Sequence, residues 1–564
     1  MQKYYRVNLK EQKKRLLDSE IAKPMISEIF SLADESLTKT YEPLKLSEYN
    51  LFFETGDRQT FDKKYSPRRT DCLALAAALW LSDDDKYLAP LIDLIYHICD
   101  EFTWCIAAHT VWQDADKTYE WYLEEVDLFN ARTATLLCDL CTIVGDKLPL
   151  LVKQRIAYEL RRRIIEPTKK KVFDWEFVGD NWIAYCVLGM SLSVALFGTQ
   201  EEMQELLPRF KNLCLDYLNG FGPDCCCAEG GTYWSVFREF LRIAVILEDA
   251  SDGEIKFLED KRVEEISKFL TRIMLSPDKI VSFSDANADI FFYPGAISFI
   301  NTLFPGKIHC PDLRLGSSFK DSMGIGIIEL LWFDTDYKTT QLKPLTTFFK
   351  NTQWYINRSE KFSFAAKGGH NDELHNHNDV GSFMVVTPDG KIPFRDLGTG
   401  LYTGQYFAAD TRYTILNNGS FGHSVPIVNG KYQCFGKNFS ATSTKAGDDF
   451  FETEISGAYE KGIVEKIIRR FDICDDGISM KDTFVFSDET ENFTERLSVS
   501  DNPVILKGEI TLDGAKIIYN PDKYKAYVFE EVYKNSNGLD TLATFIDFTP
   551  LKEDEREFEI KVEF

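Results

Sequence analysis

The spacing of apolar residues changes partway along the chain, and this change constrains the fold more than any other feature. From about residue 10 to residue 280 the apolar positions have helical spacing; Leu136, Leu140 and Val144, for example, form one stripe. Such stripes recur in pairs with short connections, as expected for antiparallel helices. The first half of the chain therefore predicts a helical toroid or solenoid.

After about residue 335 the apolar residues alternate with polar ones. At the end of the chain, Phe558, Ile560 and Val562 alternate with charged residues, so one face of this strand is expected to be buried and the other wet. Turn sequences such as Pro388-Asp389-Gly390 separate other β-rich runs. This pattern predicts antiparallel sheets stacked into a sandwich.

At 564 residues the chain exceeds the size at which a single core stops growing, so more than one domain is expected. We expect an α+β multidomain protein with an N-terminal incomplete (α/α) toroid over residues 1–335. A C-terminal antiparallel β-sandwich follows over residues 336–564. The mixed patterns of residues 281–340 mark the junction.

The charge balance limits the partners. The chain has 65 basic and 89 acidic residues, a formal net charge of −24. This negative net charge disfavours nucleic acid and an anionic membrane as partners, because both bind to clusters of Lys and Arg. An anionic glycan needs a local basic cleft, for which residues 161–163 (three Arg) and 169–171 (three Lys) are candidates; a solvated helix end is the alternative.

The N-terminal residues and the cysteines indicate the cellular compartment of the protein. The start, MQKYYRVNLKEQKKRLL, has no apolar core or cleavage site typical of a signal peptide. The thirteen cysteines, such as Cys186 in an apolar stretch, have the distribution of reduced thiols. The longest apolar run, residues 182–197, is shorter than the roughly 20 residues of a membrane helix, so we expect a buried helix. A cytoplasmic protein follows as the expectation.

Histidine is concentrated in one part of the chain. Four of the seven histidines lie between His370 and His423. On a strand, His375 and His377 would point to one face, and Asp396 with His423 would complete a nitrogen and oxygen ligand set typical of zinc. The alternative is a set of hydrogen-bonded, partly buried histidines.

Most of the chain resembles the heparinase II/III-like polysaccharide lyases. The resemblance is strongest over residues 367–433, which include KGGHNDELHNHNDVGSF, RDLGTGLYTGQYF, TRY and FGHSVPIVNGKYQ. In the helical half the similar runs are DLFNARTATLLCDL, ELRRRIIEP, GDNW and PDCCCAEGGTYW. The resemblance implies a lyase that cleaves uronic-acid-containing glycosaminoglycans by β-elimination.

The resemblance also implies a metal site. It assigns His377, Asp396 and His423 as ligands of a divalent metal, usually zinc in this family, with manganese also open. We expect the metal to orient the loop that presents His375, as groups around an active site often do. A Lewis-acid role in contact with the substrate is the alternative.

The resemblance implies three catalytic residues: Tyr233, His375 and Asn181. Asn181 would bind the substrate carboxylate and stabilise the charge that develops when the neighbouring proton leaves. Tyrosine titrates near 10, so Tyr233 needs a lowered pKa if it is the base, whereas His375 is the better base at neutral pH. We expect Tyr233 to be the acid, and the base for one uronate epimer, with His375 sharing or replacing the base role for the other.

Five further residues are candidates for substrate binding: Glu229, His109, Trp182, Arg412 and Tyr413. Trp182 stands where many relatives carry a histidine. His109 has the alternative of a satisfied buried histidine, and Arg412 that of an ion pair within the sheet.

Three classes of function follow for comparison. The leading one is a lyase acting on an anionic polysaccharide of the heparin, heparan sulfate, hyaluronan or chondroitin class; alginate or another polyuronate would undergo the same chemistry. The second is a glycoside hydrolase with Asp224 and Glu229 as paired carboxylates. The third is a glycan-binding protein without activity.

Overall fold

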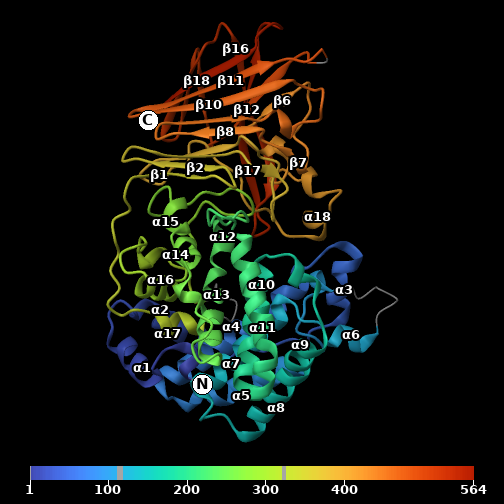
Figure 1. Cartoon of the computed structure of the whole chain (residues 1–564), viewed down its shortest axis with the longest axis vertical. Coiled ribbons are helices and arrows are strands. Elements are labelled where there is room, and N and C mark those ends of the chain that lie inside the picture. Colours follow the sequence, from blue (N-terminus) through green and yellow to red (C-terminus); the bar gives the residue numbers. More distant parts are fainter. Residues whose placement is uncertain (1, 111–117, 320–325, 489) are drawn as a thin grey trace. The chain divides into compact units, whose positions relative to one another are not determined.

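The computed structural model describes residues 2–110, 118–319, 326–488 and 490–564 (Figure 1). The chain forms two compact units. The first, the helical unit, consists of Met1–Gly220, Ser235–Glu264 and Phe292–Thr339. The second, the sandwich unit, consists of Phe221–Trp234, Glu265–Phe291 and Thr340–Phe564.

The units are not continuous in sequence, which differs from the expected division at residues 335 and 336. Two segments of the helical half belong to the sandwich unit because their polar groups are satisfied there. Asp224 accepts a hydrogen bond from the amide of Asn351 at 2.6 Å, and Arg358 donates to the carbonyl of Thr271 at 3.0 Å. Tyr233 and its neighbours are therefore part of the second unit.

The helical unit has a row of buried helices as its core. Helices α4, α7, α10 and α13 pack against one another in this order, and α5, α8 and α11 pack along the row (Figure 1). At the crossing of α10 and α7, a Cβ on Gly189 would lie only 2.5 Å from the carbonyl oxygen of Ala131, so this close approach requires glycine. Two layers of successive helices are the arrangement of an incomplete (α/α) toroid.

The helices of this unit have the following bounds: α1 (Leu9–Asp18), α2 (Lys23–Ser36), α3 (Leu46–Thr55), α4 (Gln59–Ser82), α5 (Leu88–Asp100), α6 (Tyr119–Leu123), α7 (Leu128–Val144), α8 (Leu150–Leu160), α9 (Glu166–Lys170), α10 (Asn181–Phe197), α11 (Gln200–Gly220), α13 (Phe237–Ala250), α16 (Pro294–Leu303) and α17 (Ile327–Trp332). Helix α14 (Lys261–Ser267) has residues in both units. The apolar run at residues 182–197 lies in the buried helix α10, as predicted. Among the helices described, none combines the length and apolarity that a membrane crossing requires.

The sandwich unit consists of antiparallel sheets, as the alternating pattern predicts. The largest has eight strands in the order β13-β14-β15-β18-β11-β10-β9-β8. Opposite it are two four-stranded sheets, β1-β2-β3-β5 and β16-β17-β12-β6, and the pair β4-β7 completes the set. In β18 the residues Phe558, Ile560 and Val562 are buried and their neighbours are not, so the predicted alternation is confirmed.

The strands have the following bounds: β1 (Leu345–Phe349), β2 (Trp354–Arg358), β3 (Ser363–Lys367), β4 (His370–Asn371), β5 (Phe383–Val386), β6 (Pro426–Val428), β7 (Gly436–Ser440), β8 (Ser443–Ala446), β9 (Phe450–Glu454), β10 (Lys466–Cys474), β11 (Gly477–Val485), β12 (Phe493–Val499), β13 (Val504–Leu506), β14 (Glu509–Leu512), β15 (Ala515–Tyr519), β16 (Tyr524–Lys534), β17 (Asp540–Pro550) and β18 (Glu557–Glu563). The short helices of the unit are α12 (Gly231–Trp234), α15 (Phe269–Ile273) and α18 (Gly404–Phe407).

Aromatic side chains from facing sheets fill the core of the sandwich. Phe471 of β10 lies 4.9 Å from Phe364 of β3 and 5.0 Å from Phe383 of β5, measured between ring centroids. Phe484 of β11 stacks on Phe493 of β12 at 4.1 Å. These contacts join the eight-stranded sheet to both four-stranded sheets, so one apolar core extends through the unit.

A buried charge cluster crosses the same core. Arg469 donates to Asp482 at 2.6 Å, to Glu495, and to the carbonyl of Gly381 at 2.9 Å, and all three charged side chains are fully buried. Burial raises the pKa of Glu495 well above its ordinary value, against the opposing effect of Arg469. Removing the arginine would leave two carboxyl groups without their donor in a water-free core.

We therefore expect Arg469→Met to lower the free energy of unfolding by about 3–5 kcal/mol, the range for breaking a buried ion pair from one side. The measurement is denaturant unfolding followed by circular dichroism. Lys445→Ala, which removes the exposed pair with Glu452, is the control and should cost less than about 1 kcal/mol. Equal effects of the two substitutions would contradict the role of the buried cluster.

Candidate active site and metal site

One buried carboxylate gathers donors from several segments of the sandwich unit. Asp285 accepts from Nδ1 of His375 at 2.7 Å and from Nε2 of His377 at 2.9 Å. The hydroxyl of Tyr402 donates to it at 3.1 Å, and that of Tyr406 also donates to it. The guanidinium of Arg412 lies 3.4 Å away.

These donors keep Asp285 ionised. Burial opposes the charge, but the hydrogen bonds from the two histidines outweigh it and hold the pKa of Asp285 well below its ordinary range. Burial and the neighbouring carboxylate raise the pKa of Tyr406 well above its ordinary value. The tyrosines around Asp285 therefore act as hydroxyl donors to a fixed anion.

The loop that carries Asp285 is held by close backbone contacts. Gly230 has a φ of +106°, and a Cβ there would lie 2.9 Å from the side chain of Ala286. A Cβ on Gly398, whose φ is +60°, would lie 2.0 Å from the carbonyl oxygen of Ala286. Only glycine fits at these two positions. The hydroxyl of Ser284 also bonds to the carbonyl of Ala228, which ties the loop to the segment before Tyr233.

Both histidines lie in a loop, and the expectation that residues 375–379 form a strand is wrong. The loop follows β4, and His375 has a φ of +58°, a left-handed conformation that interrupts any strand. The two imidazoles converge because each donates to one oxygen of Asp285. A shared acceptor, and not strand alternation, brings them together.

Tyr233 lies against His375. The two rings stack with their centroids 4.1 Å apart. The hydroxyl of Tyr233 is 2.7 Å from that of Tyr402. Because Tyr402 gives its own proton to Asp285, Tyr233 is the donor in this bond. Burial, followed by Tyr233 and Asp285, raises the pKa of Tyr402 well above its ordinary value, so Tyr402 stays a neutral phenol.

The two carboxylates considered for hydrolysis have different partners. Glu229 lies 3.7 Å from Nε2 of His375, on the side opposite to Asp285. Asp224 accepts the amide of Asn351. Glu229 is thus near the tyrosine and histidine, whereas Asp224 holds the backbone at the start of the sandwich.

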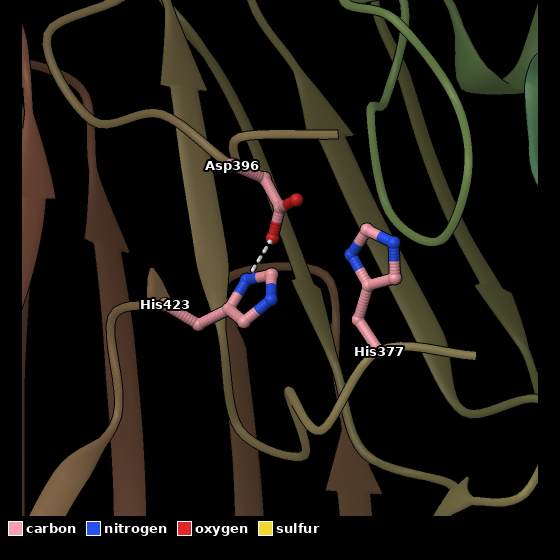
Figure 2. Close-up of side chains that lie close together, drawn as sticks. All are labelled: His377, Asp396 and His423. Atoms are coloured by element: carbon pink, nitrogen blue, oxygen red, sulfur yellow. Dashed lines mark hydrogen bonds and ion pairs between the residues drawn. The ribbon is translucent and has the colours of Figure 1, made fainter. Parts of the chain in front are cut away.

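His377, Asp396 and His423 form a compact group in the same unit (Figure 2). Each offers a ligand atom, and these atoms lie within 4.8 Å of one another. All three side chains are buried, and His423 lies 2.9 Å from Asp396. This is the set of three residues that the sequence predicted.

The outer nitrogens of both histidines are held by acceptors. Nε2 of His377 bonds to Asp285, and Nε2 of His423 bonds to the carbonyl of Asn417 at 2.8 Å. With protons on these outer nitrogens, both Nδ1 lone pairs are directed to the group. Nδ1 of His377 is buried and has no hydrogen-bond partner among the described residues, and Figure 2 shows one nitrogen of that ring facing the other two side chains. The residues therefore fit a divalent cation, with the outer contacts typical of metal-binding histidines.

Without a metal, the group is an ion pair beside a neutral histidine. Burial lowers the pKa of His377. Burial also opposes the charge on His423, but Asp396 outweighs it and raises the pKa of His423. Burial opposes ionisation of Asp396 too, and His423 with His377 holds its pKa below the ordinary value.

Three of the predicted residues lie in the helical unit. Asn181 is the buried first residue of α10, and Asp180 caps this helix by accepting the amide of Trp182. The ring of Trp182 lies 4.5 Å from that of His109. Nδ1 of His109 forms a hydrogen bond with Asp127 at 2.9 Å, so one ring nitrogen already has a partner within the protein.

Arg412 is directed into the sandwich unit. Its guanidinium donates to the carbonyl oxygens of Asn376 and Tyr406 as well as approaching Asp285. Arg412 thus has partners within the protein, although it lies in a short helical turn and not in a sheet, and its contact with a sugar stays a prediction. Tyr413 stacks on Phe435 at 4.9 Å.

The basic clusters at residues 161–163 and 169–171 have acidic neighbours, and the pocket of about 350 Å³ beside them is lined by acidic as well as basic residues. Arg161 and Lys169 both bind Glu202, and Lys170 binds Glu124. Arg162 and Arg163 both bind Glu159. These carboxylates offset part of the positive charge of the clusters.

The sequence did not point to Asp285, Tyr402 or Tyr406. Asp285 stands in the run SFSDANAD, within the stretch taken for a junction, and no motif marks it. The two tyrosines lie in RDLGTGLYTGQYF, one of the runs that carry the family resemblance. Membership in this run is the one sequence signal that could have pointed to them.

Comparison with solved structures identifies the fold. A heparinase III matches with a TM-score of 0.60 and 13% identity, covering 99% of this chain and 93% of that one. The heparan sulfate lyase HepC of Pedobacter heparinus matches with a TM-score of 0.56 and 12% identity, covering 95% and 82%. A Streptomyces coelicolor chondroitin AC lyase in complex with chondroitin sulphate matches with a TM-score of 0.55 and 10% identity, covering 98% and 82%.

These matches extend over nearly the whole chain, so the protein has the toroid and sandwich fold of the polysaccharide lyases. No family model and no curated protein matches the sequence. The predicted fold class is confirmed.

The position of Asp285 predicts a large cost for losing its charge. We expect Asp285→Asn to lower the free energy of unfolding by about 2–3 kcal/mol, because several hydrogen bonds to a charged acceptor are weakened at once. Chemical denaturation measures this. Asp289→Asn, four residues on and largely exposed, is the matched control and should change stability by less than about 0.5 kcal/mol. A cost for Asp285→Asn as small as that of the control would contradict the central role of this carboxylate.

Proposed function

We propose that this protein is a polysaccharide lyase that cleaves uronic-acid-containing glycosaminoglycans by β-elimination. The observation that carries the proposal is the pair of Tyr233 and His375, stacked at 4.1 Å and both connected to the buried carboxylate of Asp285. The fold shared with heparan sulfate and chondroitin lyases supports the same class of chemistry.

His375 is suited to take a proton. Its Nδ1 donates to Asp285, which leaves the lone pair on Nε2 as the basic atom. A carboxylate that fixes the tautomer and orientation of an imidazole in this way also stabilises the imidazolium that forms. We infer that His375 removes the proton next to the uronate carboxylate.

Tyr233 is suited to give a proton to the departing oxygen. The phenolate that remains would be next to Tyr402, which can turn its hydroxyl proton from Asp285 to that oxygen. For the other uronate epimer, the role of Tyr233 as base stays a prediction from the family resemblance. Hydrogen bonds connect Tyr233 through Tyr402 and Asp285 to His375, so one network holds the candidate acid and the candidate base.

Asn181 stays a prediction from the family resemblance. Removal of the proton places a second negative charge on the uronate carboxylate until the C4 oxygen departs, and an amide donor such as Asn181 would stabilise this charge where it develops. The substrate contacts expected of Glu229, His109 and Trp182 also stay predictions. A polyuronate such as alginate would undergo the same reaction.

We also propose that His377, Asp396 and His423 hold a divalent metal, with zinc favoured by two imidazoles and one carboxylate. When bound, the metal would fix the loop between β4 and β5 that presents His375. His377 and His375 share Asp285 as their acceptor, so ordering one imidazole orders the other.

The first test of the proposed reaction is Tyr233→Phe. We expect it to lower the rate of formation of ultraviolet-absorbing unsaturated ends by about 10²–10⁴-fold, the usual contribution of general acid–base catalysis. The assay uses a panel of heparin, heparan sulfate, hyaluronan, chondroitin and alginate. Tyr527→Phe, an exposed tyrosine of β16, is the matched control and should have full activity.

Two outcomes would count against a lyase. One is the absence of unsaturated product from every polymer with the unaltered protein. The other is an increase in reducing ends without unsaturation that Glu229→Gln abolishes, which would indicate a hydrolase.

The metal site has a readout besides activity. We expect the purified protein to contain about one equivalent of divalent metal by mass spectrometry, and His423→Ala and Asp396→Asn to lose it. His97→Ala, an exposed histidine of α5, should retain the metal. Chelation should lower the melting temperature of the unaltered protein, because metal binding stabilises the folded state. Equal metal content in all four proteins would refute the assignment.

A further inference from the structure

Arg132 of α7 differs from every other arginine of the chain. The others all donate to a carboxylate, a carbonyl or a side-chain amide of the protein. For Arg132 the described residues provide no hydrogen bond and no ion pair, and its Nε is shielded from solvent without an acceptor.

The absence of a counterion is unusual in this chain. With 89 acidic and 65 basic residues, carboxylates are abundant, and residues of the basic clusters of the helical unit pair with them. A partly buried guanidinium without an acceptor is costly unless a binding partner supplies one. The missing group is therefore expected to be an anion from outside the chain.

Aromatic rings hold Arg132 in place. Its guanidinium lies 5.5 Å from the ring of Phe129 and 5.1 Å from that of Tyr185, measured to the centroids. Such cation–π contacts orient the planar group but do not satisfy its hydrogen-bond donors. The donors stay available for a carboxylate or sulfate, whose oxygens fit the guanidinium fork.

Phe129 connects Arg132 to two residues that are expected to contact sugar. Phe129 is also in contact with His109, at 5.5 Å, and His109 with Trp182, at 4.5 Å. Arg132, Phe129 and Tyr65 line one crevice, whose volume is about 10 Å³. This is about the space of one water molecule, so the crevice admits an oxygen-sized group and not a sugar ring.

We propose that Arg132 binds an acidic group, carboxylate or sulfate, of the polysaccharide, and thereby selects an anionic chain. This inference rests on the proposed function, since it assigns a specificity-determining residue to the same substrate. It also gives a protein of net charge −24 a contact for an anionic polymer: an arginine of the helical unit that has no acidic partner among the described residues.

The test compares Arg132→Met with Arg132→Lys in the full-length chain carrying Tyr233→Phe, so that ligands are bound without turnover. Calorimetry measures the affinity for three oligosaccharides of equal length: unsulfated chondroitin, chondroitin sulfate, and unsulfated chondroitin with its carboxyl groups reduced to alcohols. We expect Arg132→Met to weaken binding of an acidic chain by about 10- to 100-fold, as for loss of a charge-assisted contact. Binding of the reduced chain should not change.

The pattern across ligands identifies the acidic group. Equal losses for the two acidic chains would assign the carboxylate, and a loss confined to the sulfated chain would assign the sulfate. Arg132→Lys should retain part of the affinity, because it keeps the charge but not the fork. Unchanged affinity for both acidic chains, or an equal loss for the reduced chain, would overturn the inference.

Stability gives a second readout. Because Arg132 has no hydrogen-bond or ion-pair partner among the described residues, Arg132→Met should leave the melting temperature of the otherwise unaltered protein equal or higher, whereas loss of a structural arginine would lower it. A fall of several degrees would overturn the inference. If the unaltered protein makes unsaturated product but Arg132→Met binds normally, only this inference fails; if no polymer yields that product, the proposed function fails.

Discussion

The charge of one buried aspartate determines the state of two histidines at once. Asp285 accepts Nδ1–H of His375 on one oxygen and Nε2–H of His377 on the other. The first contact leaves Nε2 of His375 as a basic atom, and the second leaves Nδ1 of His377 directed to Asp396 and His423. The candidate base and the candidate metal ligand are therefore set by the same anion. The pKa values of Tyr402 and Tyr406 are raised, so both phenols stay protonated. They stabilise the Asp285 anion by donating hydrogen bonds to it.

Helices and strands were predictable from the sequence because their signals are local. The alternation in β18 and the apolar run in α10 each depend on neighbouring residues and on a single buried face. The division into units was less predictable, since Phe221–Trp234 and Glu265–Phe291 read as part of the helical half but find their hydrogen-bond partners in the sandwich. Which surface a segment packs on depends on distant residues, and apolar periodicity carries no information about that choice.

The site shows the same limit. The sequence could point to His377, Asp396 and His423 because the chain has few histidines. His377 and His423 also lie in a short stretch that carries the family resemblance. Asp285 precedes His377 by 92 residues, and its importance comes from donors that only the fold brings together. The strand expected at residues 375–379 was wrong for a related reason: His375 has a left-handed backbone and bonds to Asp285, which is 90 residues away in the sequence.

The interleaved course of the chain has an evolutionary consequence. Tyr233 and Asp285 precede Thr340, the start of the longest sandwich segment, yet both belong to the sandwich unit. A gene fragment encoding only residues 340–564 would carry His375 and the candidate metal ligands without Tyr233 and Asp285. Recombination at a single point near residue 340 would therefore separate the groups of the candidate site, even though all of them belong to one unit.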